Sequence, residues 1–398
     1  MNPEPPPPLD PSWTAATRAV RAGRAHDGDS LAPVLWSSTT FRPESVADAR
    51  RKALTPRPAR FYTRYGNPTV AAFEEAIAEL EGAEAARAFA SGMGALSGVI
   101  LGLCSQGSHI VASRQLYGGT RQLLEGVCPR FGIEVTFVDG TTPGALAAAV
   151  VPGRTVLVVA ETPANPRLDL VDLEELGRIQ GPFTVVDSTF ATPFAQQPLR
   201  YGVDLVVHSA TKAIAGNNDA TLGVVAGEAD LIDWISGFAN LQGANASPHD
   251  ALAGLRGVRT LGVRLRAQSE TAGAVATFLE GHDAVTEVRY PGLASHPQFD
   301  LAKRQLELPG ALVAFDLVGG YESGVRFVES LRLVQHAPSL GGPETLVCHP
   351  ASTTHAGLDA EQLAEGLIGP GTVRLSIGLE GAADVLADLG NALDAARS

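Results

Sequence analysis

The chain has 398 residues, of which 45% are hydrophobic and 18% charged, and its formal net charge is −13. This balance is typical of a globular protein with a large core, and the acidic charge excludes the basic surface expected of proteins that bind nucleic acid or anionic membranes. Three separated cysteines form neither a disulfide framework nor a zinc motif, and we find no signal peptide or apolar run of membrane-spanning length, so we expect a cytoplasmic protein without a metal.

Residues 1–66 have the pattern of a proline-rich tail followed by an irregular arm. Apolar side chains then recur at helical spacing from Val70 to Leu80, and Gly82 ends this predicted helix. Strand-like and helix-like segments alternate after it, which indicates a mostly parallel sheet covered on both faces. The predicted strands are His109–Ser113, Glu134–Asp139, Thr155–Glu161, Phe183–Asp187, Asp204–His208 and Thr221–Ala226, and predicted helices between them include Thr120–Phe131 and Leu173–Ile179.

A long helical stretch from about Asp250 to Leu279 leads into a smaller α+β region. In that region Leu312–Leu317 and Thr372–Ile377 are predicted strands, and Ala382–Ala396 is the predicted last helix. The expected parts are an N-terminal tail and arm (1–66), a large α/β domain (67–258) and a C-terminal α+β domain (259–398).

Lysine is rare in this chain. Lys52, Lys212 and Lys303 are the only lysines among 30 basic residues. Because a lysine amine can lose its proton and form an imine, whereas arginine cannot, a retained lysine is a candidate for amine chemistry. Lys52 and Lys303 lie in polar, helix-like surroundings, whereas Lys212 lies between an apolar strand and a glycine turn.

The segment Ser209-Ala-Thr-Lys212 follows the predicted strand Asp204–His208. It should therefore lie at the carboxyl end of that strand, where open α/β sheets bind ligands. The hydroxyls of Ser209 and Thr211 beside one amine suit a small molecule that carries a phosphate and an aldehyde. Two alternatives remain: a surface lysine in a loop, or the Ser-x-x-Lys pair of penicillin-recognising enzymes, whose Ser-Asp-Asn and Lys-Thr-Gly elements do not occur here.

Asp187 ends another apolar strand and should face the same cleft as Lys212. A carboxylate at that place suits the pyridine nitrogen of pyridoxal 5′-phosphate (PLP), because the protonated ring is the electron sink that stabilises a carbanion. The alternative for Asp187 is a helix N-cap.

Three weaker signals accompany these residues. Ser91-Gly-Met-Gly-Ala95 joins an Ala/Phe-rich strand to a helix, a turn that presents free amides to phosphate but matches neither a Rossmann nor a P-loop motif. Tyr117 follows a strand, where it could stack on a cofactor ring or simply pack half-buried. Arg374 lies inside an apolar strand and needs a partner, either a ligand carboxylate or an internal acid.

Taken together and in this order, these segments resemble the Cys/Met-metabolism PLP family, which includes cystathionine γ-synthase, cystathionine γ-lyase, cystathionine β-lyase, methionine γ-lyase and the homoserine-ester sulfhydrylases. The resemblance runs from about Ser30 to the C-terminus. It is carried by the co-linear motifs Tyr62–Thr69, Ser91–Gly94, Tyr117–Thr120, Glu161–Pro166, Val186–Phe190, Ser209–Lys212, Ser339–Gly342, His349–His355 and Val373–Glu380.

The resemblance implies a PLP-dependent aminotransferase-like (fold type I) large domain and a smaller C-terminal α+β domain. Lys212 would carry PLP as a Schiff base and shuttle protons. Asp187 would pair with the pyridine nitrogen, and Asn165 would bond the 3′ oxygen of the ring. Tyr117 would stack on the ring and assist proton transfer.

The remaining implied roles concern the phosphate, the substrate and a second subunit. The residues that would hold the phosphate are Gly92, Met93, Ser209 and Thr211. Ser339 and Arg374 would bind the carboxylate of a small amino-acid substrate. Tyr62 and Arg64 would reach the phosphate of a neighbouring subunit, which implies a homodimer or homotetramer with shared active sites.

The implied activity is γ-replacement on an activated homoserine, as in cystathionine γ-synthase, and the alternatives are γ-elimination of cystathionine, a homoserine-ester sulfhydrylase or methionine γ-lyase. Gly119 stands where typical methionine γ-lyases carry cysteine, and Pro338 replaces the glutamate of animal-type γ-lyases. Asn218-Asp219 is similar to the plant-type γ-synthases. Ala213 and Asn217 depart from the usual aromatic residue and histidine beside the lysine, so a non-catalytic PLP-binding protein is the alternative from a different class.

Overall fold

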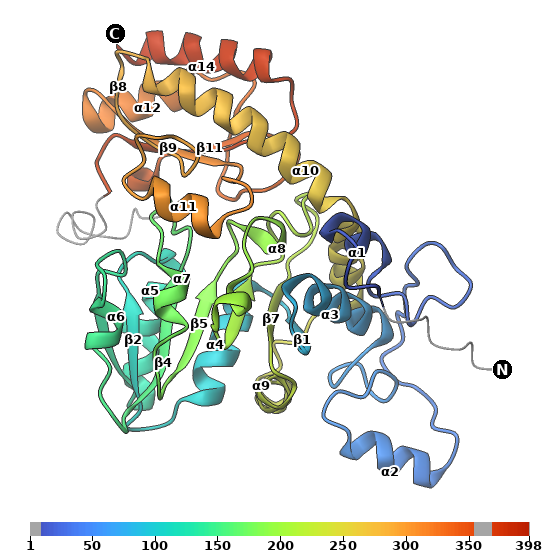
Figure 1. Ribbon diagram of the computed structural model, residues 1–398. Coiled ribbons are helices and arrows are strands. Elements are labelled where there is room, and N and C mark those ends of the chain that lie inside the picture. The colour runs from blue at the N-terminus through green and yellow to red at the C-terminus, as the bar shows by residue number, and fades with distance from the viewer. Residues whose placement is uncertain (1–8, 354–367, 398) are drawn as a thin grey trace.

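A seven-stranded sheet forms the centre of the larger domain in the computed structural model, which describes residues 9–353 and 368–397 (Figure 1). Its strand order is β1-β7-β6-β5-β4-β2-β3. The strands from β6 to β3 in this order are parallel, whereas β7 is antiparallel to both β1 and β6. The predicted mostly parallel α/β sheet is thus confirmed. The strands are β1 (Ala85–Phe89), β2 (His109–Ser113), β3 (Glu134–Val138), β4 (Thr155–Glu161), β5 (Phe183–Asp187), β6 (Leu205–His208) and β7 (Gly223–Gly227).

Helices cover both faces of this sheet because its central strands are apolar on both sides. In β4, Leu157 and Val159 pack in one hydrophobic cluster, and Val158 and Ala160 pack in another on the opposite face. The first face is covered by α4 (Gly92–Leu103) and α9 (Ala229–Gln242), and the second by short helices that include α6 (Ala145–Ala148) and α7 (Leu173–Leu176). α3 (Pro68–Glu81), α5 (Gly118–Gln122) and α8 (Thr192–Ala195) complete the helices of this domain.

A smaller domain contains a five-stranded sheet of order β10-β11-β12-β9-β8. Its strands are antiparallel except for the β10–β11 pair. The elements are β8 (Val285–Arg289), β9 (Leu312–Leu317), β10 (Gln335–His336), β11 (Leu346–Cys348), β12 (Thr372–Ser376), α11 (Phe299–Gln305), α12 (Gly320–Ser330) and α14 (Ala382–Ala396). This is the expected smaller α+β region.

The helix α10 (Pro248–Glu280) connects the two domains over 33 residues (Figure 1). It begins at the N-cap Ser247 with proline in its first turn. Its first half joins the core around α3, and its second half joins the core of the small domain. The expected domain boundary after residue 258 falls inside this helix and stays a prediction.

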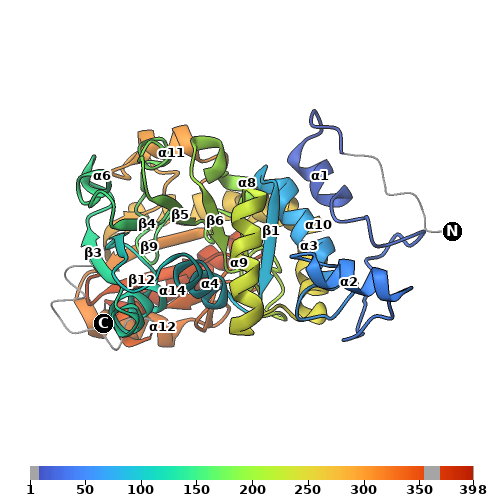
Figure 2. The ribbon, with the colours of Figure 1, turned by 90° about the horizontal axis from the view of Figure 1, so that it is seen from below.

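The arm contains two short helices, α1 (Ala15–Arg21) and α2 (Val46–Leu54), where the sequence indicated irregular structure. Their N-caps are Thr14 and Ser45, whose side-chain oxygens accept backbone N–H bonds. In both views α2 lies at one edge of the molecule (Figures 1 and 2). Within the described ranges, no helix has the length and apolar character needed to cross a membrane.

Two helix predictions were too long. The segment predicted as one helix over 120–131 is the end of α5, then a π turn (Leu123–Val127) and a 3₁₀ turn (Cys128–Phe131), because Pro129 has no N–H to continue an α-helix. The segment predicted over 173–179 stops at Leu176, where Gly177 packs against the backbone of Tyr201.

Candidate active site

A cavity of about 460 Å³ lies at the carboxyl ends of β4, β5 and β6. This is the edge at which parallel α/β sheets bind ligands. Ten of the twelve predicted site residues line it: Gly92, Met93, Tyr117, Asn165, Asp187, Ser209, Thr211, Lys212, Ser339 and Arg374. Segments that are far apart in the sequence, including two from the small domain, thus meet at one site.

Lys212 lies in the loop after β6, and its Nζ donates to Ser339 Oγ over 2.9 Å. Arg264 fixes the following turn through a 2.8 Å bond from Nη1 to the carbonyl of Ala213. Burial and then repulsion from Arg374 lower the pKa of Lys212. Because a lower pKa raises the fraction of neutral amine, the site favours the form of lysine that attacks an aldehyde.

Asp187 ends β5 with a buried carboxyl group. Its Oδ1 accepts both the backbone N–H of Thr189, at 3.0 Å, and the hydroxyl of Thr189, at 2.5 Å. Among the described residues no hydrogen bond reaches Oδ2. Burial raises the pKa of Asp187 in spite of the bonds from Thr189, so a cationic group that entered the cavity would relieve the cost of this buried charge.

The first turn of α4 forms another wall of the cavity. Ser91 is its N-cap and accepts the N–H of Gly94 at 3.0 Å. A Cβ atom on Gly92 would lie only 2.7 Å from Ser209 Cβ, so the close approach of these two segments requires glycine. Thr211, in the opposite loop, binds both backbone groups of Leu222 through its hydroxyl. The helix N-terminus and two hydroxyl-bearing residues therefore meet at one end of the cavity, an arrangement suited to a phosphate.

Arg374 forms the other end of the cavity and is 3% exposed. Its Nη1 donates to Asn165 Oδ1 at 2.6 Å, and its Nη2 donates to the carbonyl of Ser339 at 3.0 Å. Both acceptors are neutral, and among the described residues Arg374 makes no ion pair. Ser339 has a φ of 130°, a costly conformation for a residue with a side chain. The described residues thus place no acid within ion-pair distance of Arg374, and a ligand carboxylate would complete the site.

Tyr62 and Arg64 are the two predicted residues that do not line this cavity. They lie on the arm, where Tyr62 is 42% exposed and the guanidinium of Arg64 lies 5.5 Å from the centre of its ring. The structure thus leaves this pair outside the cavity of its own chain.

The main site residue that sequence reasoning missed is Glu161, which lines the cavity from the end of β4. The signal that identified Asp187, an acid at the end of an apolar strand, was present for Glu161 as well. Phe190 was also missed; its ring lies 5.7 Å from the guanidinium carbon of Arg374.

Two buried histidines, His208 and His349, have partners inside the protein. His208 Nε2 lies 2.5 Å from Glu81 Oε1, and His349 Nε2 lies 2.7 Å from the carbonyl of Pro370. Thr354 and His355, the end of the motif that begins at His349, lie outside the described residues.

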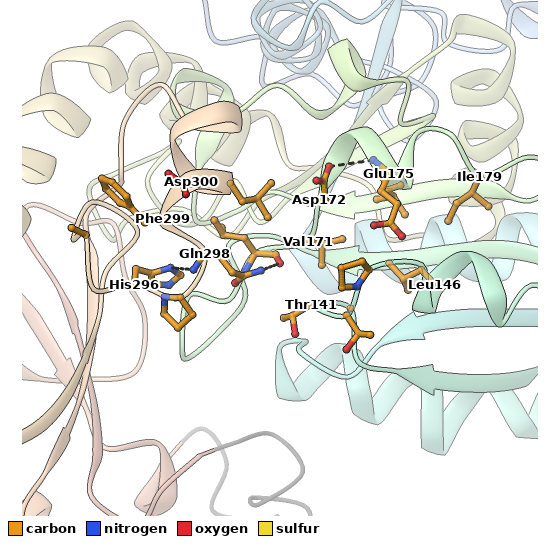
Figure 3. A pocket seen from close by; sticks show the side chains of 18 residues that line it. Thr141, Leu146, Val171, Asp172, Glu175, Ile179, His296, Gln298, Phe299 and Asp300 are labelled. Atoms are coloured by element: carbon orange, nitrogen blue, oxygen red, sulfur yellow. Dashed lines mark hydrogen bonds between the residues drawn. The ribbon is translucent and has the colours of Figure 1, made fainter.

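A second cavity of about 490 Å³ lies away from Lys212, between the two domains. Figure 3 shows Leu146 and Ile179 on one side of it and His296 and Phe299 on the other. Its polar side chains connect the domains: Gln298 accepts the N–H of Leu170 at 2.7 Å, and Asp172 pairs with Arg304 at 3.1 Å. The second cavity thus lies among contacts between the domains, and none of the twelve predicted site residues lines it.

Comparisons with known proteins agree with this geometry. The family model described as Cys/Met metabolism PLP-dependent enzyme matches residues 16–394. An L-methionine gamma-lyase of Porphyromonas gingivalis is 42% identical over 95% of this chain and 96% of its own length. An O-succinylhomoserine sulfhydrylase of Pseudomonas aeruginosa is 40% identical over 95% of each chain.

Solved structures extend the similarity to the whole fold. A cystathionine gamma synthase from Xanthomonas oryzae pv. oryzae, solved with cystathionine, has a TM-score of 0.90 and 40% identity, over 97% of this chain and 99% of its own. The predicted fold type I architecture and the use of PLP are thereby confirmed. The chain belongs to the Cys/Met metabolism family of PLP-dependent enzymes.

Proposed function

We propose that the protein catalyses γ-replacement on an activated homoserine, with Lys212 and the other predicted residues as its active site. The observation that carries the proposal is that a single residue, Ser339, connects the amine of Lys212 to the guanidinium of Arg374, which can bind a carboxylate. Lys212 Nζ is 2.9 Å from Ser339 Oγ, and the carbonyl of the same Ser339 is 3.0 Å from Arg374 Nη2. An α-amino acid bound through its carboxylate at Arg374 would therefore place its Cα near Lys212.

The cavity fits PLP in three respects. The buried carboxyl of Asp187 suits a protonated ring nitrogen, and the amine of Lys212 has a lowered pKa. The first turn of α4, with no room for a side chain on Gly92, suits a phosphate. When bound, PLP supplies an electron sink for the electron pair left at Cα.

The chain's own residues would do the rest of the work. Lys212 Nζ would hold the cofactor covalently and, once released, move protons at Cα and Cβ of the substrate. Asp187 would keep the ring nitrogen protonated through its negative charge. Arg374 and Ser339 would orient the substrate, and Tyr117 would cover the ring and assist proton transfer.

We infer a homodimer or homotetramer with shared active sites from the arm. Tyr62 and Arg64 do not line the cavity of their own chain. Other arm residues have exposed apolar side chains: Leu31 is 87%, Val46 89% and Leu54 73% exposed. Exposed apolar groups of this size are typical of surfaces that a partner covers. A second copy whose cavity receives Tyr62 and Arg64 would explain both features.

γ-Elimination is the second candidate, favoured by the 42% identity to L-methionine gamma-lyases. Against methionine as the substrate stands Gly119. A Cβ atom there would lie 2.5 Å from the ring of Tyr117, so the cysteine usual in those enzymes would displace the ring from its present position. The absence of that cysteine supports replacement as the main reaction.

The test is to incubate the purified, PLP-loaded protein with O-succinyl-, O-acetyl- or O-phosphohomoserine together with cysteine. We expect cystathionine from at least one ester, with Lys212→Ala as the inactive control. Parallel incubations with L-methionine and L-cystathionine would measure 2-oxo acid release. No thioether from any ester, together with rapid 2-oxo acid release, would reject replacement in favour of elimination.

A further inference from the structure

Glu161 is a buried acid in the cavity wall that the proposed reaction does not use. It is 4% exposed and lies beside Asp187 in the register of the parallel strands β4 and β5. Burial and then the neighbouring charge of Asp187 raise the pKa of Glu161 to about 8. Two adjacent buried carboxyl groups are costly, so the position of Glu161 needs an explanation beyond packing.

The two oxygens of Glu161 accept backbone N–H groups from two different loops. Oε2 accepts the N–H of Tyr117, at 2.6 Å, in the loop after β2. Oε1 accepts the N–H of Asn165, at 2.8 Å, in the loop after β4. One carboxyl group therefore fixes the distance between the two loops.

The same bond to Asn165 supports the substrate end of the cavity. The side chain of Asn165 accepts Arg374 Nη1 at 2.6 Å. Arg374 in turn donates a hydrogen bond to the carbonyl of Ser339. The hydroxyl of Ser339 accepts a hydrogen bond from Lys212 Nζ. A shift of the Asn165 backbone would thus be transmitted along hydrogen bonds to the groups that orient substrate and amine.

We propose that Glu161 is a positioning residue that sets the width of the slot between Tyr117 and Asn165 in which the cofactor ring binds. The inference rests on the proposed function, because that function places the ring between these two residues. Glu161 would touch neither ring nor substrate and would act through the two loops alone. A glutamine offers only one oxygen and turns its NH₂ donor toward the second N–H, so it cannot hold both loops.

The experiment compares the full-length wild-type protein with Glu161→Gln and with the matched control Asp388→Asn. Asp388 is also a buried carboxylate that fixes a loop, because it accepts the N–H groups of Leu333 and Val334, both at 2.9 Å, but it does not line the cavity. For each protein, PLP is titrated to obtain its dissociation constant, and the visible circular dichroism of the bound cofactor is recorded. The second signal reports how firmly the ring is held in an asymmetric slot, which overall stability does not determine.

In Glu161→Gln we expect about tenfold weaker PLP binding and a smaller visible circular dichroism signal per bound PLP. In Asp388→Asn we expect a lower Tm with wild-type PLP affinity and signal. Unchanged affinity and signal in Glu161→Gln would overturn the proposal, and so would an equal loss of both in the control.

Two further outcomes are distinguishable. If Glu161→Gln does not fold, Glu161→Asp replaces it. This variant keeps both carboxyl oxygens but is one methylene too short to reach both loops, so unchanged PLP affinity and dichroism would again overturn the proposal. A wild-type protein that binds no PLP would instead reject the proposed function itself, and the role of Glu161 with it.

Discussion

At Asp187, the burial that raises the pKa of the carboxyl also makes it a strong partner for a cation. Replacing it with asparagine keeps the size and removes the charge. We expect Asp187→Asn to fold and to lower kcat by about 10²-fold or more, because the ring nitrogen would lose its charged partner. The matched control is Asp204→Asn. Asp204 also accepts a backbone N–H, that of Thr184 at 2.7 Å, but it lies at the amino end of the strands and does not line the cavity. Steady-state kinetics test this; wild-type kcat in Asp187→Asn would reject the role.

Glu161 gives the cofactor-free protein a specific dependence of stability on pH. Its pKa is raised from 4.5 to about 8 by burial and by Asp187, while Arg374 and two backbone N–H groups oppose the rise. The folded state therefore holds the proton more tightly than the unfolded state, so this contribution to stability is fully present below pH 4.5 and is lost as the pH rises through about 8. Chemical denaturation between pH 5 and pH 8 should show a smaller loss of stability in Glu161→Gln than in the wild type. An equal loss of unfolding free energy with pH in the two proteins would contradict the raised pKa of Glu161.

The first turn of α4 supports a prediction about an element. Gly92→Ala would place a Cβ atom 2.7 Å from Ser209 Cβ and separate the helix N-terminus from the lysine loop. In Gly94→Ala the new Cβ atom would meet only ordinary contacts, at 3.4 Å from Ala244 Cβ and from Ser91 Oγ. We expect about tenfold weaker PLP binding in the first variant, from the loss of helix-end contacts to phosphate, and little change in the second. Equal PLP affinity in both variants would show that α4 does not hold the phosphate.

The strands of the large sheet could be predicted from sequence because they are apolar runs bounded by polar or glycine residues. β2, β4 and β5 begin and end at the predicted residues. The arm helices α1 and α2 could not be predicted, because each is short. In addition, α1 is stabilised by packing on α10, a contact that no local sequence pattern reveals. Lys212 and Asp187 could be predicted to converge because the carboxyl ends of parallel strands meet at one edge, whereas residues such as Asn165 and Ser339 came from the family resemblance. Glu161 carries the same strand-end signal as Asp187, but its partners are backbone N–H groups, which leave no trace in the sequence.

At the scale of the whole molecule, the position of Tyr62 and Arg64 outside the cavity predicts active sites shared between subunits. Arg64→Ala and Lys212→Ala should each be nearly inactive. When the two inactive variants are mixed and reassembled, a mixed pair contains one site with both Lys212 and Arg64. We expect recovery to about a quarter of wild-type activity for random mixing in dimers. No recovery beyond the separate variants would contradict shared sites.

The visible absorption spectrum of the purified protein with PLP tests the central claim most directly. It is recorded before and after the addition of L-cystathionine or an O-acylhomoserine, in the wild type and in Lys212→Ala. The account predicts a long-wavelength visible band in the wild type that is absent from Lys212→Ala and shifts when at least one of these amino acids is added. A wild-type protein that shows no such band after PLP is supplied would contradict it.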